Sequence, residues 1–215
     1  GQTKGNVVLS CKNLGWKENF ELAKELGIKL RLDVAIFLEN DANLAGLAEA
    51  QALRPTPQTC LYVTISTGIG TGIAINGQLT KEFLNFEGGQ AVIEYDCILR
   101  VWEDFASGRA IYETYGRYAK DINSKAVWEQ IADKIARGFL ILIPTLRPDV
   151  IVIGGSIGTY FSKYEVTLRE ILKEHLSTKM FGEYSIVQAQ HPEKAVIYGC
   201  YIYASEKLGH EKITS

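Results

Sequence analysis

The chain has 215 residues, of which 47% are hydrophobic and 22% are charged, and its formal net charge is −2. This balance is typical of a soluble globular protein and provides no basic surface for nucleic acid. No apolar run reaches the roughly 18 residues of a membrane-spanning helix, and residues 1–6 do not resemble a signal peptide. We therefore expect neither a membrane nor a nucleic acid as a partner.

The chain has four cysteines, Cys11, Cys60, Cys97 and Cys200. Their wide spacing matches neither a CxxC pair nor a zinc knuckle, so we expect buried thiols rather than disulfides or metal ligands. This use of cysteine indicates a reducing, cytoplasmic setting.

The first part of the chain alternates between apolar runs and helical spacing. The expected elements are a strand at 7–10, a helix at 18–27, a buried strand at 34–38 and a helix at 41–53. Gly27 is the expected stop of the first helix, and Pro55 ends the second.

A β-rich block follows Pro55, and helices and strands alternate after it. The expected strands lie at 61–65, 73–75, 78–80, 150–153 and 184–189, and the expected helices at 101–115, 124–145, 163–175 and 195–208. Asn76-Gly77 is a strong hairpin signal, and Ser124 can cap the long helix. The β-branched run at 150–153 is typical of a parallel strand buried on both faces, so we expect an α/β protein with a mixed sheet.

Residues 39–43, Glu-Asn-Asp-Ala-Asn, place polar side chains between an expected strand and an expected helix. Polar groups at that point reach a crevice at the carboxyl end of a sheet. A helix cap would explain one of them, but their density favours a functional site. A carboxylate at a helix N-terminus stays ionised and can accept the proton of a hydroxyl that attacks phosphorus.

Residues 67–72, Thr-Gly-Ile-Gly-Thr-Gly, follow an expected strand. Alternate glycines let a backbone turn sharply and present N–H groups to an anion. The segment is neither a Rossmann fingerprint nor a P-loop, because a strand rather than a helix follows it. It is therefore a candidate phosphate-binding turn, and the alternative is a glycine-rich β-turn without a ligand.

Three further segments have a structural explanation as well as a functional one. Glu87 and Gln90, separated by glycines, can reach adjacent sugar hydroxyls or simply belong to a polar loop. Glu103 can be a surface charge of a helix. Gly154 and Gly155, after a strand, permit close approach of a nucleotide or only a tight turn.

The order of these segments resembles the ROK family of sugar kinases and sugar-responsive repressors over nearly the whole chain. The matching stretches are residues 39–43, 67–72, 87–90, 103–108 and 147–155. The resemblance implies the actin-like ATPase (ribonuclease H-like) fold, with a complete second lobe and a partial first lobe. We expect a first-lobe remnant with its linker helix at 1–54, the C-terminal lobe at 55–197 and a helix returning to the first lobe at 198–215.

The resemblance also implies roles for individual residues. Asp41 is the expected catalytic base, and the expected sugar-binding residues are Asn40, Asp41, Glu87, Gln90 and Glu103. The expected contacts to ATP are Thr67, Gly68 and Gly70 at the phosphates and Gly154 and Gly155 beside the adenosine. The implied activity is a glucokinase-like or N-acetylhexosamine kinase-like transfer from ATP with Mg²⁺ to a monosaccharide, by a homodimer.

Two departures from the family pattern bear on function. The family's zinc site uses the His of Glu-x-Gly-His and three cysteines, whereas Gln90 stands at the His position and residues 91–102 contain only Cys97. Zinc needs about four ligands, so we expect none to be bound, and Gln90 to alter which sugar fits.

The second departure is that the family's Asp-x-Gly-Gly-Thr segment, which grips phosphate and magnesium, has no counterpart in this chain. We therefore expect an incomplete ATP site, which leaves open whether this chain is active. Two other functions also stay open: the sugar-sensing lobe of a ROK-type repressor, and a degenerate module that binds neither ligand.

Overall fold

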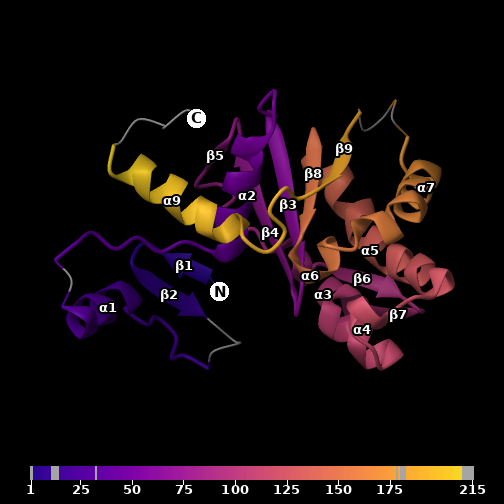
Figure 1. Cartoon of the computed structure of the whole chain (residues 1–215), viewed down its shortest axis with the longest axis horizontal. Coiled ribbons are helices and arrows are strands. Elements are labelled where there is room, and N and C mark those ends of the chain that lie inside the picture. The colour runs from indigo at the N-terminus through magenta and orange to yellow at the C-terminus, as the bar shows by residue number, and fades with distance from the viewer. Residues whose placement is uncertain (1, 11–14, 32, 178, 180–182, 210–215) are drawn as a thin grey trace.

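A computed structural model describes residues 2–10, 15–31, 33–177, 179 and 183–209. A five-stranded sheet forms the centre of the molecule, with helices on both of its faces. Figure 1 shows α2 and α9 on one side of this sheet and α5 and α7 on the other. The chain therefore has the α/β layering that the sequence predicts.

The N-terminal part contains a small antiparallel pair, β1 (Gln2–Lys4) and β2 (Val7–Ser10), followed by α1 (Leu22–Leu30). The prediction that Gly27 ends this helix is wrong. The helix continues to Leu30, and the C-cap residue Arg31 has a φ of 50° that lets its N–H return to the carbonyl oxygens of Gly27 and Ile28. A helix end is set by the residue that adopts the left-handed conformation, and here that residue is an arginine.

The prediction of a buried strand at residues 34–38 is also wrong. These residues have no regular secondary structure, and the side chain of Val34 is 65% exposed. No strand in the described part of the chain pairs with them. A strand needs a neighbour for its backbone hydrogen bonds, so an apolar pattern alone does not make one.

The central sheet has the order β5-β4-β3-β8-β9. Its strands are β3 (Thr59–Ile65), β4 (Ile69–Ile75), β5 (Gln78–Leu79), β8 (Val150–Gly154) and β9 (Ser185–Gln188). The pairs β3–β4 and β4–β5 are antiparallel, and β8 runs parallel to both β3 and β9. The mixed sheet is confirmed, and so is the Asn76-Gly77 turn, where φ is 50° and 72°.

The helices and remaining elements frame this sheet. They are α2 (Asp41–Ala52), η2 (Gly88–Gln90), β6 (Val92–Tyr95), β7 (Ile98–Val101), α3 (Trp102–Ala106), α4 (Gly108–Tyr115), η3 (Ala119–Asp121), α5 (Lys125–Leu146), α6 (Gly155–Gly158), η4 (Phe161–Lys163), α7 (Glu165–His175) and α9 (Ala195–Lys207). Ser124 caps α5 as predicted, through a hydrogen bond from Val127 N. The β6–β7 hairpin was not predicted, because its turn at Asp96 and Cys97 uses non-glycine residues with positive φ.

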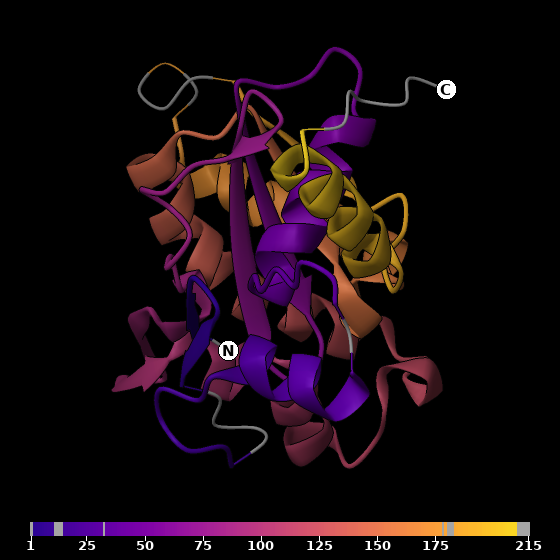
Figure 2. The same ribbon diagram turned by 90° about the vertical axis from the view of Figure 1, so that its left-hand side faces the viewer.

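The side chains of β3 divide the interior into two cores. Leu61, Val63 and Ile65 face the larger core, which the apolar side of α5 completes. Cys60 and Tyr62 point to the opposite face, where α2 and α9 cover the sheet. Figure 2 shows these two helices crossing beside one another. The division of the chain into residues 1–54, 55–197 and 198–215 stays a prediction.

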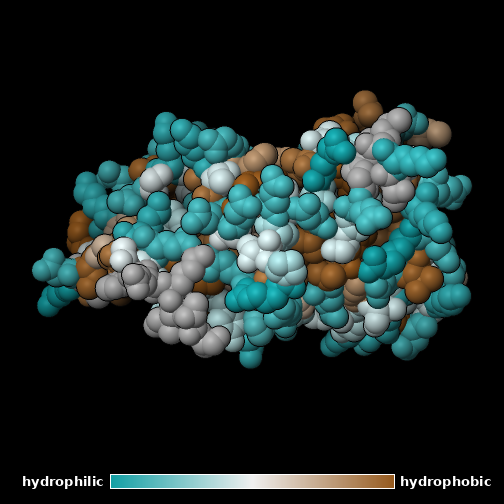
Figure 3. Space-filling model, turned by 90° about the horizontal axis from the view of Figure 1, so that it is seen from above, coloured by the Kyte–Doolittle hydropathy of each residue, from teal (hydrophilic) through white to brown (hydrophobic). Residues whose placement is uncertain are grey.

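The surface seen in Figure 3 is mostly hydrophilic, with apolar side chains scattered over it. Among the described residues, no helix combines the length and the apolarity that spanning a bilayer requires. Cys60 is a buried free thiol, whereas the free thiols of Cys97 and Cys200 are exposed. Cys11 lies outside the described residues.

Candidate active site

The polar residues at 39–43 divide into supporting residues and one exposed carboxylate. Asn40 is the N-cap of α2, and its Oδ1 accepts hydrogen bonds from Ala42 N at 2.8 Å and Asn43 N at 3.4 Å. Glu39 Oε1 accepts from Asn43 Nδ2 at 2.9 Å, and the same amide donates to Leu84 O. Asp41 is exposed at the first turn, where the helix dipole favours a negative charge.

Glycines on two other elements fix the position of this helix. A Cβ atom on Gly72 of β4 would lie 2.3 Å from Ala42 O, and one on Gly199 of α9 would lie 1.9 Å from Leu44 O. Both neighbours are backbone atoms, so any side chain at either glycine would force α2 away. These two glycines, because they have no side chain, thus determine where Asp41 lies relative to the sheet.

The expected phosphate-binding segment is shorter than the sequence indicates. Its turn comprises residues 66–68, closed by a hydrogen bond from Ser66 N to Gly68 O at 2.8 Å, while Gly70 already belongs to β4. Gly108 N, at the start of α4, donates to Ser66 O at 2.6 Å. Ser156 Oγ donates to Ser66 Oγ at 3.3 Å. Thr67 and Gly68 therefore form the tip of a braced turn.

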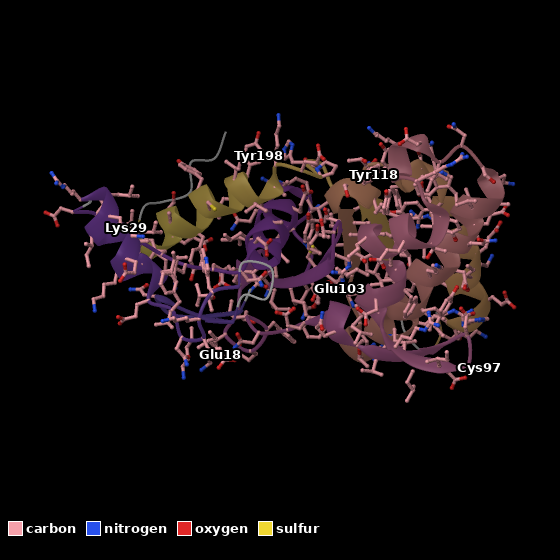
Figure 4. All side chains as sticks on the ribbon, turned by 90° about the horizontal axis from the view of Figure 1, so that it is seen from below. Glu18, Lys29, Cys97, Glu103, Tyr118 and Tyr198 are labelled. Carbon is pink, nitrogen blue, oxygen red and sulfur yellow. The ribbon has the colours of Figure 1, made fainter. Side chains whose placement is uncertain are left out.

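Glu103 supports the same turn through a hydrogen bond from the backbone. Its Oε2 accepts a hydrogen bond from Ile69 N at 2.8 Å. The preceding residue, Trp102, is fully buried, donates from Nε1 to Lys134 O at 3.1 Å and lies against Gly138 of α5. Figure 4 shows Glu103 near the middle of the molecule, far from the hairpin tip that carries Cys97.

Glu87 and Gln90 flank two glycines that pack against β4. The buried hydroxyl of Thr71 accepts from Gly88 N at 2.8 Å and donates to Phe86 O at 3.3 Å. A Cβ atom on Gly89 would lie 2.0 Å from Ile69 O, so η2 rests directly on the strand. Glu87 is half-buried and Gln90 is exposed.

The diglycine after β8 packs against β3. A Cβ atom on Gly154 would lie 2.2 Å from the Tyr62 hydroxyl, and one on Gly155 would lie 2.5 Å from Ile65 O. Gly155 has a φ of +79° and donates its N–H to Pro192 O at 3.0 Å. Residue 155 must adopt a positive φ and leave room for the carbonyl oxygen of Ile65, and only glycine does both.

Two adjoining cavities meet at the Ser66 turn. The smaller, of about 280 Å³, is lined by Asp41, Ala42, Ala45, Tyr62, Thr64, Ser66, Gly155, Ser156, Pro192, Glu193, Ala195 and Val196. The larger, of about 560 Å³, is lined by Ser66, Thr67, Gly108, Arg109, Tyr112, Tyr118, Ala119, Lys120, Ser156, Ile157, Thr159, Tyr160 and Glu193. Ser66, Ser156 and Glu193 belong to both, so Asp41 and Thr67 line neighbouring cavities.

The sequence-predicted residues do not all reach these cavities. Asp41, Thr67 and Gly155 line them, whereas the following do not: Asn40, Gly68, Gly70, Glu87, Gln90, Glu103 and Gly154. Sequence reasoning missed the cations of Arg109 and Lys120 and the stacked rings of Tyr112 and Tyr118, 4.6 Å apart. No local pattern marks these residues, although Arg109 follows the Ser-Gly that opens α4.

Among the described residues, no group of three or more His, Cys, Asp or Glu side chains is arranged to hold a metal ion. The carboxylates of Asp41 and Glu193 both line the smaller cavity. One or two carboxylates together with phosphate oxygens are the usual protein environment of Mg²⁺. Glu193, which lines both cavities, therefore fits as a ligand of a magnesium ion that arrives with a nucleotide.

The sequence model of the ROK family matches residues 2–207. The chain belongs to the ROK family. It is 28% identical to a putative fructokinase of Bacillus subtilis, over 98% of this chain and 75% of that protein. It is 22% identical to the xylose repressor of Caldicellulosiruptor bescii, over 93% of this chain and 58% of the repressor.

The ROK chain also resembles solved structures. The crystal structure of an inorganic polyphosphate/ATP-glucomannokinase from Arthrobacter sp. strain KM matches it with a TM-score of 0.74 and 27% identity, over 96% of this chain and 71% of that one. The expected family and the expected actin-like ATPase fold are both confirmed.

Proposed function

We propose that this ROK protein transfers the terminal phosphoryl group of ATP to a hydroxyl group of a hexose or an N-acetylhexosamine. One observation carries the proposal: Asp41 lies exposed at the N-terminus of α2 and lines a cavity that shares Ser66, Ser156 and Glu193 with a larger one. An acceptor beside Asp41 and a nucleotide in the larger cavity would therefore meet at the Ser66 turn.

Asp41 is the proposed general base. Its carboxylate accepts the proton of the sugar hydroxyl while that oxygen bonds to the γ-phosphorus and the bond to the β-phosphate oxygen breaks, releasing ADP. Phosphoryl transfer depends mainly on positioning and charge stabilisation, so a carboxylate held in the right place suffices. Asn40, Glu87, Gln90 and Glu103 are the proposed contacts to the sugar.

The larger cavity is the proposed nucleotide site. Arg109 and Lys120 supply positive charge for phosphates, and the rings of Tyr112 and Tyr118 supply flat apolar surface for a base. Thr67, Gly68 and Gly70 are the proposed phosphate contacts, and Gly154 and Gly155 lie on the adenosine side. A magnesium ion bound with ATP would neutralise charge on the transferred phosphoryl group.

The similarity to a polyphosphate/ATP-glucomannokinase and to a putative fructokinase supports a phosphotransferase. The similarity to a xylose repressor favours a second candidate, a sugar sensor without kinase activity. The two differ in chemistry rather than in sugar binding, because both need a sugar bound next to Asp41.

ADP release across a panel of hexoses and N-acetylhexosamines, with Mg²⁺ and ATP, tests the proposal. We expect at least one sugar to raise ADP release well above the sugar-free rate. If sugars raise the melting temperature but cause no ADP release, the protein is a sugar sensor rather than a kinase. A protein that responds to neither sugar nor nucleotide would be the degenerate module.

We also propose that the protein is cytoplasmic, because a kinase of this class needs the ATP pool and the sparse cysteines suit a reducing compartment. The proposal that it forms a homodimer rests on the resemblance to the family. Light scattering coupled to size exclusion measures the assembly directly. A monomeric mass at micromolar concentration would contradict the dimer.

A further inference from the structure

Glu49 is a buried carboxylate that lies eight residues beyond Asp41 on the same helix, α2. Only 2% of its surface is exposed. Its Oε2 accepts a hydrogen bond from Gln190 N at 2.8 Å, and its Oε1 accepts one from His191 N at 2.9 Å. Both carboxylate oxygens therefore hold the loop that connects β9 to α9.

This loop is part of the cavity wall. Pro192 O accepts the hydrogen bond from Gly155 N at 3.0 Å, and Glu193 lines both cavities. The His191 ring lies 4.6 Å from the Tyr198 ring of α9. A short series of contacts thus runs from Glu49 through the loop to Gly155, which lines the smaller cavity together with Asp41.

The carboxylate of Glu49 does more than fill space in the interior, because it accepts hydrogen bonds from the loop. A buried carboxylate is costly unless it is hydrogen-bonded, and an apolar side chain would leave two loop N–H groups without an acceptor. Hydrogen bonds to a charged acceptor in a low-dielectric interior are among the stronger ones in proteins. The loop is therefore held to the helix that carries Asp41 by a strong, directional contact.

We propose that Glu49 is a positioning residue. By fixing residues 190–193, and with them Gly155, it sets the distance between Asp41 and this part of the proposed nucleotide site. The inference rests on the proposed kinase function for its consequence in catalysis. It predicts that weakening this contact impairs nucleotide binding and leaves sugar binding intact.

The test compares Glu49→Gln, which has the same size but turns an N–H₂ group toward a loop N–H, with Glu49→Asp, which keeps both oxygens. Calorimetry measures the dissociation constants of Mg²⁺–ATP and of the preferred sugar separately. We expect Glu49→Gln to weaken Mg²⁺–ATP binding roughly tenfold, from the loss of one charge-assisted hydrogen bond. We expect the sugar constant to stay within about twofold and Glu49→Asp to recover part of the loss.

Ile131→Val provides the matched control, since Ile131 is fully buried in α5 and contacts neither cavity. If it lowers the melting temperature as much as Glu49→Gln but leaves Mg²⁺–ATP binding unchanged, lower stability does not explain the effect. Equal losses of ATP binding in both variants, or unchanged ATP binding in Glu49→Gln, would overturn the inference.

Amide hydrogen exchange separates this inference from the proposed function, because it needs no turnover. We expect Glu49→Gln to accelerate exchange at Gln190, His191 and Gly155, with the first turn of α2 unaffected. Unchanged protection at Gly155 would overturn the positioning role even if the protein is a kinase. Accelerated exchange in a protein that phosphorylates no sugar would contradict the proposed function alone.

Discussion

Glu103 fills the space that a side chain on Gly68 would need, because a Cβ atom at residue 68 would lie 2.3 Å from Glu103 Oε2. The same oxygen accepts the hydrogen bond from Ile69 N at 2.8 Å. The glycine at the tip of the turn and the carboxylate of α3 therefore depend on one another. A segment proposed to bind phosphate and a residue proposed to bind sugar form one structural unit.

This dependence predicts that substitutions at the two positions are not additive. Gly68→Ala would push the Glu103 carboxylate from Ile69 N and lower the free energy of unfolding by about 1–3 kcal/mol. Glu103→Ala would lose the same hydrogen bond. The double variant should therefore lose less free energy of unfolding than the two single variants together, by about 1 kcal/mol or more. Urea unfolding of the three variants measures this coupling. Strictly additive losses would mean that the two residues act independently.

The contact between Gly72 and Ala42 O predicts a severe effect of a single methyl group. Gly72→Ala places a Cβ atom 2.3 Å from that backbone oxygen, and neither strand nor helix can yield without moving α2. We expect a loss of about 1–3 kcal/mol of stability together with reduced turnover. The control is Gly27→Ala in α1, whose nearest neighbour is a side-chain atom at 3.8 Å. That variant should gain up to about 1 kcal/mol, and equal losses in both would contradict the packing role of Gly72.

Tyr62 predicts a pH dependence of stability at alkaline pH. Burial, followed by the charge of Glu49, raises the pKa of Tyr62 from 10.0 to about 12. The native state favours the neutral phenol. The contribution of this phenol to the free energy of unfolding is therefore complete below pH 10 and is lost as the pH rises through 12. At pH 11 the loss amounts to about 1.4 kcal/mol.

Tyr62→Phe removes this titration but keeps the ring, which makes it the matched comparison. Between pH 8 and pH 11, urea unfolding should show a smaller fall of stability for Tyr62→Phe than for the wild type, by about 1.4 kcal/mol. The raised pKa of the Cys60 thiol, to about 12, contributes equally to both proteins. Identical falls in the two proteins would show that the Tyr62 hydroxyl does not titrate at a raised pKa.

Gln90, at the position of the family's zinc-binding histidine, predicts that zinc does not support this fold. Gln90 and Cys97 are both exposed, on η2 and at the tip of the β6–β7 hairpin. We expect substoichiometric zinc by mass spectrometry and an unchanged melting temperature after chelation, because a structural zinc would contribute directly to folding. Close to one zinc ion per chain, with destabilisation on chelation, would contradict this.

Local patterns predicted the elements whose cause is local. The start of α2 at Asp41, the Ser124 cap of α5 and the buried strand at 150–153 follow from patterns within a few residues. Residues 34–38 were predicted wrongly because a strand also depends on a neighbour that local sequence does not reveal. The β6–β7 hairpin was missed because Asp96 and Cys97 are not residues that usually mark such a turn.

The same distinction applies to the candidate site. The position of Asp41 was predictable, since a polar cluster at a helix start is visible in the sequence. The contact of Glu49 with Gln190 and His191 spans more than 140 residues, so no spacing rule could find it. The cavity residues Arg109 and Tyr118 are likewise brought together only by the fold.

The turnover of Asp41→Asn tests the proposed role of Asp41 most directly. Asparagine keeps the size of the side chain and an acceptor for Ala42 N but cannot take a proton from a sugar hydroxyl. With saturating Mg²⁺–ATP and the preferred sugar, we predict that kcat for ADP release falls at least about a hundredfold. The KM for the sugar should stay within about threefold, because the amide still fills the same place. A kcat equal to that of the wild type would contradict Asp41 as the general base.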